Sequence, residues 1–186
     1  MNIYDLPTSL NAAGQLLHIR NDGDWRMVID VNIAITDPEL DEQERAVAAL
    51  SIFYDCPLEE IADLQAAVNA MLQFIAVDDR EDGNAKKPRL IDWEEDAGII
   101  ISGINGVLNR EVRAERYMHW WTFIAAYMAI GDSVLATVVS IRDKVARGKK
   151  LEKHEKEFKR DNPHYFRPRK RDTEAAYSRL LDLIGE

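Results

Sequence analysis

Hydrophobic residues recur at helical spacing along most of this chain, and short polar segments separate the stretches in which they recur. The longest apolar stripe runs from Leu58 to Ile75, directly after Pro57, a residue that suits the first position of a helix. Shorter stripes with the same spacing begin near Trp25, Val47, Trp93 and Val134. The pattern predicts a mainly α fold, a single-domain bundle of about six helices.

Acidic residues mark the expected starts of two of these helices. Asp41 with Glu44, and Asp92 with Glu95, fit variants of the capping box, in which each side chain accepts a hydrogen bond from the end of the helix backbone. The charged segment 77–90 contains glycine and proline, so we expect an exposed loop there.

The first twenty residues depart from the helical pattern. Residues 9–11 and 15–19 can pair as short strands around Gly14, because glycine readily takes the positive φ of a tight turn. We expect a short β-hairpin within residues 8–20. The polar run 21–24 then supplies capping groups for a helix that begins at Trp25.

The segment from Tyr117 to Ile141 contains only two ionisable residues, His119 and Asp132, and its 25 residues are enough to span a bilayer. However, an aspartate at membrane depth costs about 2.5 to 3.5 kcal/mol on insertion scales. The triplet Gly131-Asp132-Ser133 is instead typical of a helix stop followed by an N-cap. We therefore expect two buried helices, near 115–130 and 133–147, and no membrane span.

The charge of the chain is divided unevenly. The net charge is −9, but residues 142–171 carry 13 Lys and Arg against 5 Asp and Glu, which gives +8 there and −17 elsewhere. We expect a helical domain over residues 1–147 and a basic, partly mobile extension over 148–186. The extension can be a solvated helix held by charge pairs, an arm that recruits an acidic or helical partner, or an arm that binds nucleic acid. The acidic remainder of the chain makes nucleic acid the least favoured partner.

Candidate chemical groups are few. Cys56 lies before Pro57 and is expected to be a small apolar filler. Glu115 and His119 are four residues apart and can share a helix face, but two ligands do not make a metal site. We expect His119 to be an amphipathic residue at the rim of the core, whose ring packs while one nitrogen reaches a carboxylate or carbonyl. We expect the carboxylates of residues 92–96 to favour a helix N-terminus. The sequence therefore predicts no enzyme activity, no cofactor and no metal site.

Residues 117–127, with the sequence YMHWWTFIAAY, predict a helix that is apolar on most sides and therefore central in the fold. Trp121 and Ile124 are expected in the core. Because aromatic residues also anchor protein interfaces, Tyr117, Trp120 and Tyr127 are candidate edges of a partner-binding groove. Further candidate partner-binding residues lie in the extension: Lys149, Lys150, Lys153, Phe158, Tyr165 and Phe166.

The order of these motifs resembles the bacteriophage gene-product-fifteen family from about residue 6 to residue 160. The most specific match is His119-Trp120-Trp121. The other matching segments are Leu6-Pro7-Thr8-Ser9, Asp24-Trp25-Arg26, Asp41-Glu42-Gln43-Glu44, Phe53-Tyr54, Ile91-Asp92-Trp93-Glu94-Glu95-Asp96-Ala97 and Ile141-Arg142. Members of the family often end near Asp161, so the last 25 residues of this chain are an addition.

The resemblance implies a protein encoded among phage tail genes, similar to the small chaperones that hold the tape measure protein before the tail tube forms. We therefore expect a non-enzymatic chaperone or adaptor that binds the tape measure protein in the host bacterial cytoplasm. A structural component of the virion is the alternative, and a nucleic-acid-associated regulator that acts through the basic extension is a less favoured one. Formation of a homo-oligomer is left open.

Overall fold

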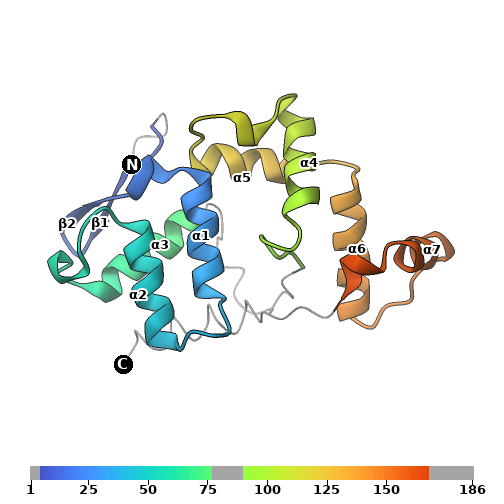
Figure 1. Ribbon diagram of the computed structural model, residues 1–186, viewed down its shortest axis with the longest axis horizontal. Coiled ribbons are helices and arrows are strands. Elements are labelled where there is room, and N and C mark those ends of the chain that lie inside the picture. Colours follow the sequence, from blue (N-terminus) through green and yellow to red (C-terminus); the bar gives the residue numbers. More distant parts are fainter. Residues whose placement is uncertain (1–4, 77–89, 168–186) are drawn as a thin grey trace. The chain divides into compact units, whose positions relative to one another are not determined.

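Helices make up most of the part of the chain that the computed structural model describes, residues 5–76 and 90–167 (Figure 1). Contacts group these residues into two compact units, the first with residues 5–76 and 115–125 and the second with residues 90–114 and 126–167. The predicted mainly α fold with an N-terminal hairpin is confirmed. The predicted boundary between residues 147 and 148 does not coincide with this grouping and stays a prediction.

Two strands open the first unit. Strands β1 (Ser9–Ala12) and β2 (Gln15–His18) pair antiparallel, with Ala12 opposite Gln15. Both residues of the connecting turn have positive φ, 50° at Ala13 and 93° at Gly14, as a two-residue hairpin turn of the primed type requires. The predicted hairpin is therefore confirmed, with the turn at the predicted glycine.

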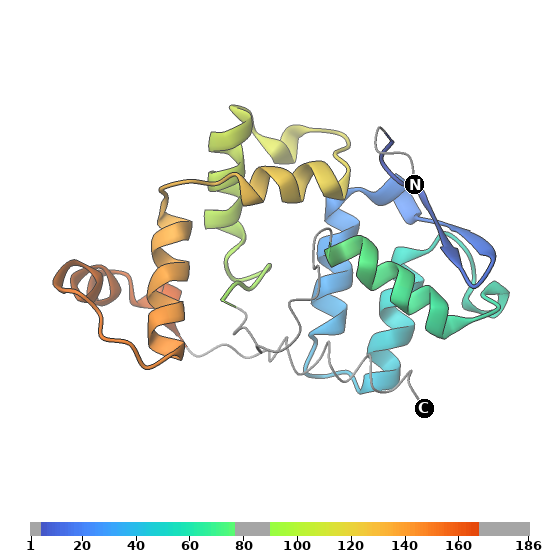
Figure 2. The same cartoon turned by 180° about the vertical axis from the view of Figure 1, so that it is seen from behind.

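Helices α1 (Trp25–Ile35) and α2 (Glu42–Phe53) follow, and both begin at the predicted caps. The Asp24 carboxylate accepts a hydrogen bond from the Arg26 N–H. At the start of α2, Asp41 and Glu44 each accept from the other's backbone N–H, so the first predicted capping box is confirmed. The two helices lie side by side in both views (Figures 1 and 2).

Helix α3 (Leu64–Ala76) is shorter than the predicted stripe from Leu58 to Ile75, which was expected to form one helix. Leu58–Glu60 form only a short 3-10 turn. The Gln15 side chain donates to the Glu60 carbonyl at 2.7 Å and accepts from the Ala62 N–H at 2.9 Å. Because the hairpin occupies these backbone groups, the chain leaves the helical path and restarts as α3.

The second unit contains α4 (Ala97–Leu108), the 3-10 turn η3 (Val112–Ala114), α6 (Val134–Ala146), α7 (Lys153–Asp161) and the 3-10 turn η4 (Pro163–Phe166). Helix α5 (Trp120–Met128) contributes residues to both units. The hydroxyl of Ser133 accepts from the Ala136 N–H, which confirms the predicted stop and N-cap before α6.

The second predicted capping box is only partly right. Asp92 accepts from the N–H groups of Glu94 and Glu95, as expected. The reciprocal acceptor is Asp96, which takes the Asp92 N–H at 2.9 Å, and α4 begins one residue later at Ala97. Glu95 therefore remains available to solvent.

Most of the predicted loop 77–90 and the end of the predicted extension, 168–186, lie outside the described residues. Within the described ranges, each helix is too short or too polar to cross a membrane.

Candidate functional site

Residues 118–121, which lead into α5, form hydrogen bonds with two other helices of the first unit, α3 and α1. The Trp120 indole N–H donates to the Ile75 carbonyl, and the Trp121 indole N–H donates to the Phe74 carbonyl, each at 3.0 Å. The last carbonyls of a helix have no partner within that helix. The two indole N–H groups therefore supply hydrogen-bond partners for carbonyls at the C-terminal end of α3.

The same segment also fixes the start of α1. The Asp24 carboxylate accepts from the Met118 N–H at 3.0 Å, and the Trp25 N–H donates to the Met118 carbonyl at 3.0 Å. The Trp25 ring stacks on Phe123 of α5, with ring centroids 4.5 Å apart. These contacts place Met118, Trp120 and Phe123 in the core of the first unit.

His119 is part of this core. It is 1 % exposed, so it is not the rim residue that its polarity suggested. Its Nδ1 accepts from the Trp121 N–H, which leaves Nε2 to donate to the Pro7 carbonyl at 3.0 Å, so the predicted contact with a carbonyl is confirmed. Burial lowers the pKa of His119 below its usual value, although the bond to Pro7 acts in the opposite direction. The ring is therefore neutral and structural, and neither nitrogen is open to a metal ion.

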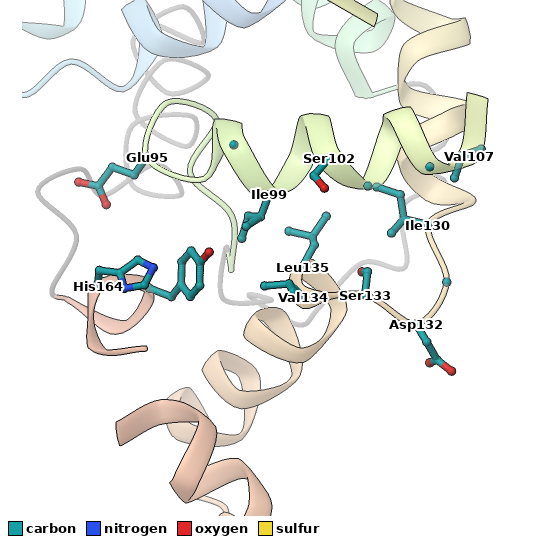
Figure 3. Close-up of a pocket in the computed structure, with 15 residues that line it drawn as sticks. Glu95, Ile99, Ser102, Val107, Ile130, Asp132, Ser133, Val134, Leu135 and His164 are labelled. Atoms are coloured by element: carbon teal, nitrogen blue, oxygen red, sulfur yellow. The ribbon is translucent and has the colours of Figure 1, made fainter. Parts of the chain in front are cut away.

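A groove of about 750 Å³ opens in the second unit, between α4, the turn that leads into α6, and η4 (Figure 3). Its apolar lining comes from Ile99, Val107, Ile130, Val134 and Leu135. Val134 was expected on the buried stripe of α6, but it is 48 % exposed, and Val107 of α4 is 40 % exposed. The groove therefore presents aliphatic surface to solvent.

The α4 side of the groove carries small residues at four-residue spacing, Gly98, Ser102 and Gly106, which places them on one helix face. Among the described residues, a Cβ atom at Gly98 or Gly106 would meet no neighbour within 4 Å. Gly103 differs, because a Cβ atom there would lie 2.6 Å from Cδ1 of Ile130. Among the three glycines of α4, Gly103 alone has a close neighbour that gives a steric reason for glycine.

Two carboxylates lie at opposite ends of the groove lining, Glu95 near the start of α4 and Asp132 in the turn before α6 (Figure 3). Both are exposed, and within the described ranges neither forms an ion pair. The residues that line the groove include His164 but neither lysine nor arginine. The groove is therefore an aliphatic surface with negative ends.

A buried ion pair holds one wall of the groove in place. Arg142 of α6 forms two hydrogen bonds with the Asp96 carboxylate, at 2.6 and 2.9 Å, and Asp96 is 2 % exposed. The same guanidinium donates to the carbonyls of Leu90 and Tyr165. Because Tyr165 lines the groove, Arg142 fixes η4 relative to α4 and α6.

Residues 3–165 of the chain match the family described as Bacteriophage Gp15 protein. The chain belongs to this family. None of the curated proteins and none of the solved structures in the comparison matches it. Membership in the Gp15 family makes the chain a bacteriophage protein, and it confirms the family expected from the sequence.

The aromatic residues predicted to bind a partner in this Gp15 protein have different environments. Trp120 is 1 % exposed, so its expected place at an open groove edge is corrected: its indole caps α3 instead. Tyr117 is 47 % exposed and donates to the Asp22 carbonyl. Tyr127 is half-buried and packs on the Trp93 ring, with centroids 5.4 Å apart, while burial raises the pKa of its hydroxyl.

Core placement of the two other aromatic-helix residues is only partly as predicted. Ile124 is buried, as expected. Trp121 is half-buried rather than fully buried, although its indole N–H has a protein partner.

The described part of the predicted extension belongs to the second unit of the Gp15 protein. Lys144 of α6 pairs with Glu155 of α7 at 2.6 Å, and this hydrogen bond lowers the pKa of Glu155 and raises that of Lys144. Lys149, Lys150 and Lys153 are exposed.

The aromatic residues of the extension lie closer to the body of the unit. The rings of Phe158 and Phe166 meet with centroids 6.3 Å apart, and both are half-buried. Tyr165 lines the groove, and it is the one residue of the predicted partner-binding set that does so. The groove was not predicted from the sequence. The pattern that could have indicated it is the four-residue spacing of Gly98, Ser102 and Gly106 within an apolar helix.

Proposed function

We propose that this phage protein acts without catalysis, as a tail assembly chaperone or adaptor that binds a helical stretch of the tape measure protein. The observation that carries the proposal is the open aliphatic groove along α4 in a member of the Gp15 family. Grooves of this kind accept the apolar face of an amphipathic helix. A long helical protein with an exposed apolar face tends to aggregate, and covering that face suppresses association.

The absence of catalysis is part of the same proposal. His119 and Asp96 are buried polar groups of the types that enzymes use, but each is engaged with protein partners that position helices. The carboxylates of Glu95 and Asp132 lie at opposite ends of the groove lining and are exposed (Figure 3). This arrangement supports recognition of a polypeptide rather than proton transfer to a substrate. The expected place of action is the host bacterial cytoplasm during tail assembly.

Co-expression with the tape measure protein of the same phage tests the proposal. We expect the protein to raise the soluble fraction of the tape measure protein and to co-purify with it. A variant with Val107→Asp and Val134→Asp places charges on exposed aliphatic positions of the groove, so it should lose both effects while its circular dichroism is unchanged. If the tape measure protein neither binds nor becomes more soluble, the chaperone function is refuted.

Mass spectrometry of purified phage particles separates this function from a structural one. A chaperone that acts during assembly should be missing from finished particles. Recovery of the protein in a fixed ratio to tail proteins would replace the proposal with that of a structural virion component.

A further inference from the structure

We propose that the α4 groove selects a helix of a second protein that presents small side chains to α4 and basic side chains to Glu95 and Asp132. The inference rests on the proposed function, because it names the kind of helix that the same groove accepts. The proposed occupant of the groove is a helix of a partner protein, as the shape and charge of the groove lining indicate.

The shape argument comes from α4. Glycine within a helix is less favourable than alanine, because it loses more backbone freedom on folding. Packing inside the second unit accounts for Gly103, but Gly98 and Gly106 face the groove with room around them. With Ser102 between them, they leave a row without large side chains, along which the backbone of another helix can approach closely. Exposed Val107 and Val134 flank this row and supply apolar contact.

The charge argument comes from the ends of the groove. Glu95 and Asp132 are exposed and lie at opposite ends of the lining (Figure 3). The lining carries these two carboxylates and neither lysine nor arginine, so at the ends of the groove a cationic side chain is attracted and an acidic one is repelled. Glu95 and Asp132 thus favour a partner helix with Lys or Arg near each end of its apolar face.

Synthetic peptides test both arguments against the full-length protein. The probe is a fluorescein-labelled amphipathic peptide of about 20 residues, with Ala and Leu on one face, Gln on the other and Lys at both ends. One control peptide replaces the terminal Lys with Glu, and a second replaces the Ala residues of the apolar face with Phe. We expect fluorescence anisotropy to report binding of the first peptide, and weaker binding of both controls.

Variants of the protein assign the binding to the groove. Gly106→Leu fills the small-residue row and should lower affinity about tenfold or more. Glu95→Gln and Asp132→Asn should each lower affinity for the Lys peptide by about two- to fivefold, with a weaker salt dependence. Ala146→Leu is the matched control, because Ala146 is exposed on α6 and does not line the groove. Circular dichroism and thermal denaturation should show that Gly106→Leu remains folded, since leucine favours helix more than glycine.

Equal binding of the three peptides, or unchanged affinity of folded Gly106→Leu, would overturn the inference. So would a concentration-dependent dimer, seen by sedimentation and lost in Gly106→Leu, because a second copy of the chain would then occupy the groove. If the tape measure protein co-purifies equally well with wild type and Gly106→Leu, the groove inference fails and the proposed function stands. If the Lys peptide binds as expected but the tape measure protein does not, the proposed function fails and the groove inference stands.

Discussion

Removing the indole N–H of Trp120 provides a quantitative test of how α3 is held. In Trp120→Phe the aromatic ring is kept, but the Ile75 carbonyl loses its partner in a place that water cannot reach, since Trp120 is 1 % exposed. An unsatisfied buried polar group costs about 1 to 3 kcal/mol, and the smaller ring leaves unfilled space that adds to this cost. We expect a loss of about 2 to 4 kcal/mol in the free energy of unfolding.

Trp121→Phe is the matched comparison. It removes the same kind of bond, to the Phe74 carbonyl in the same turn of α3 and at the same distance of 3.0 Å. Because Trp121 is half-buried, water can reach the freed carbonyl, and the loss should be about 0.5 to 1.5 kcal/mol. Urea denaturation followed by circular dichroism at pH 7 measures both variants. An equal or larger loss in Trp121→Phe would refute the argument that burial of the cap sets its contribution.

Three further predictions follow from the same structure. Burial holds the pKa of His119 below its usual value of 6.5, so the unfolded chain takes up a proton first as the pH falls. The free energy of unfolding should therefore be constant in this respect above about pH 6.5 and decrease below it, by about 1.4 kcal/mol per pKa unit of difference between the two states. Urea denaturation of His119→Gln should show a smaller decrease over the same pH range. Arg142→Met leaves buried Asp96 without its cation and should cost about 3 to 5 kcal/mol, whereas the double variant with Asp96→Leu should recover part of the loss in the same assay. Gly98→Ala should raise stability by up to about 1 kcal/mol, whereas Gly103→Ala should melt at a lower temperature than Gly98→Ala because Ile130 must move; equal melting temperatures would contradict this difference.

Local signals in the sequence located the starts of several elements. The caps at Asp24, Asp41 and Ser133 form hydrogen bonds to residues two or three positions away. Both partners of each cap therefore lie within one helical turn and can be recognised from a short stretch of sequence. The hairpin turn at Ala13 and Gly14 is equally local. These elements could be predicted because their causes lie within a few residues.

Features with distant causes could not be predicted in this way. The apolar stripe from Leu58 is helical in period, but Gln15 takes the backbone groups of Glu60 and Ala62 and interrupts the helix. Asp96 looked like one of several N-terminal carboxylates, yet its partner Arg142 is 46 residues away. Helical spacing also cannot distinguish the buried Leu135 from the exposed Val134, because neighbouring positions on one stripe differ only in what packs against them.

The proposed function places the site of recognition on α4 and not on the aromatic helix. The most specific residues of the sequence, His119-Trp120-Trp121, use their polar atoms to close helix ends inside the first unit, so changes there act first on folding. Gly98 and Gly106 of α4 have no close neighbour at the Cβ position within the described residues, so Gly106 can be enlarged without an internal clash. A variant that separates partner binding from stability should therefore be found on α4, where added volume meets the partner and not the protein's own core.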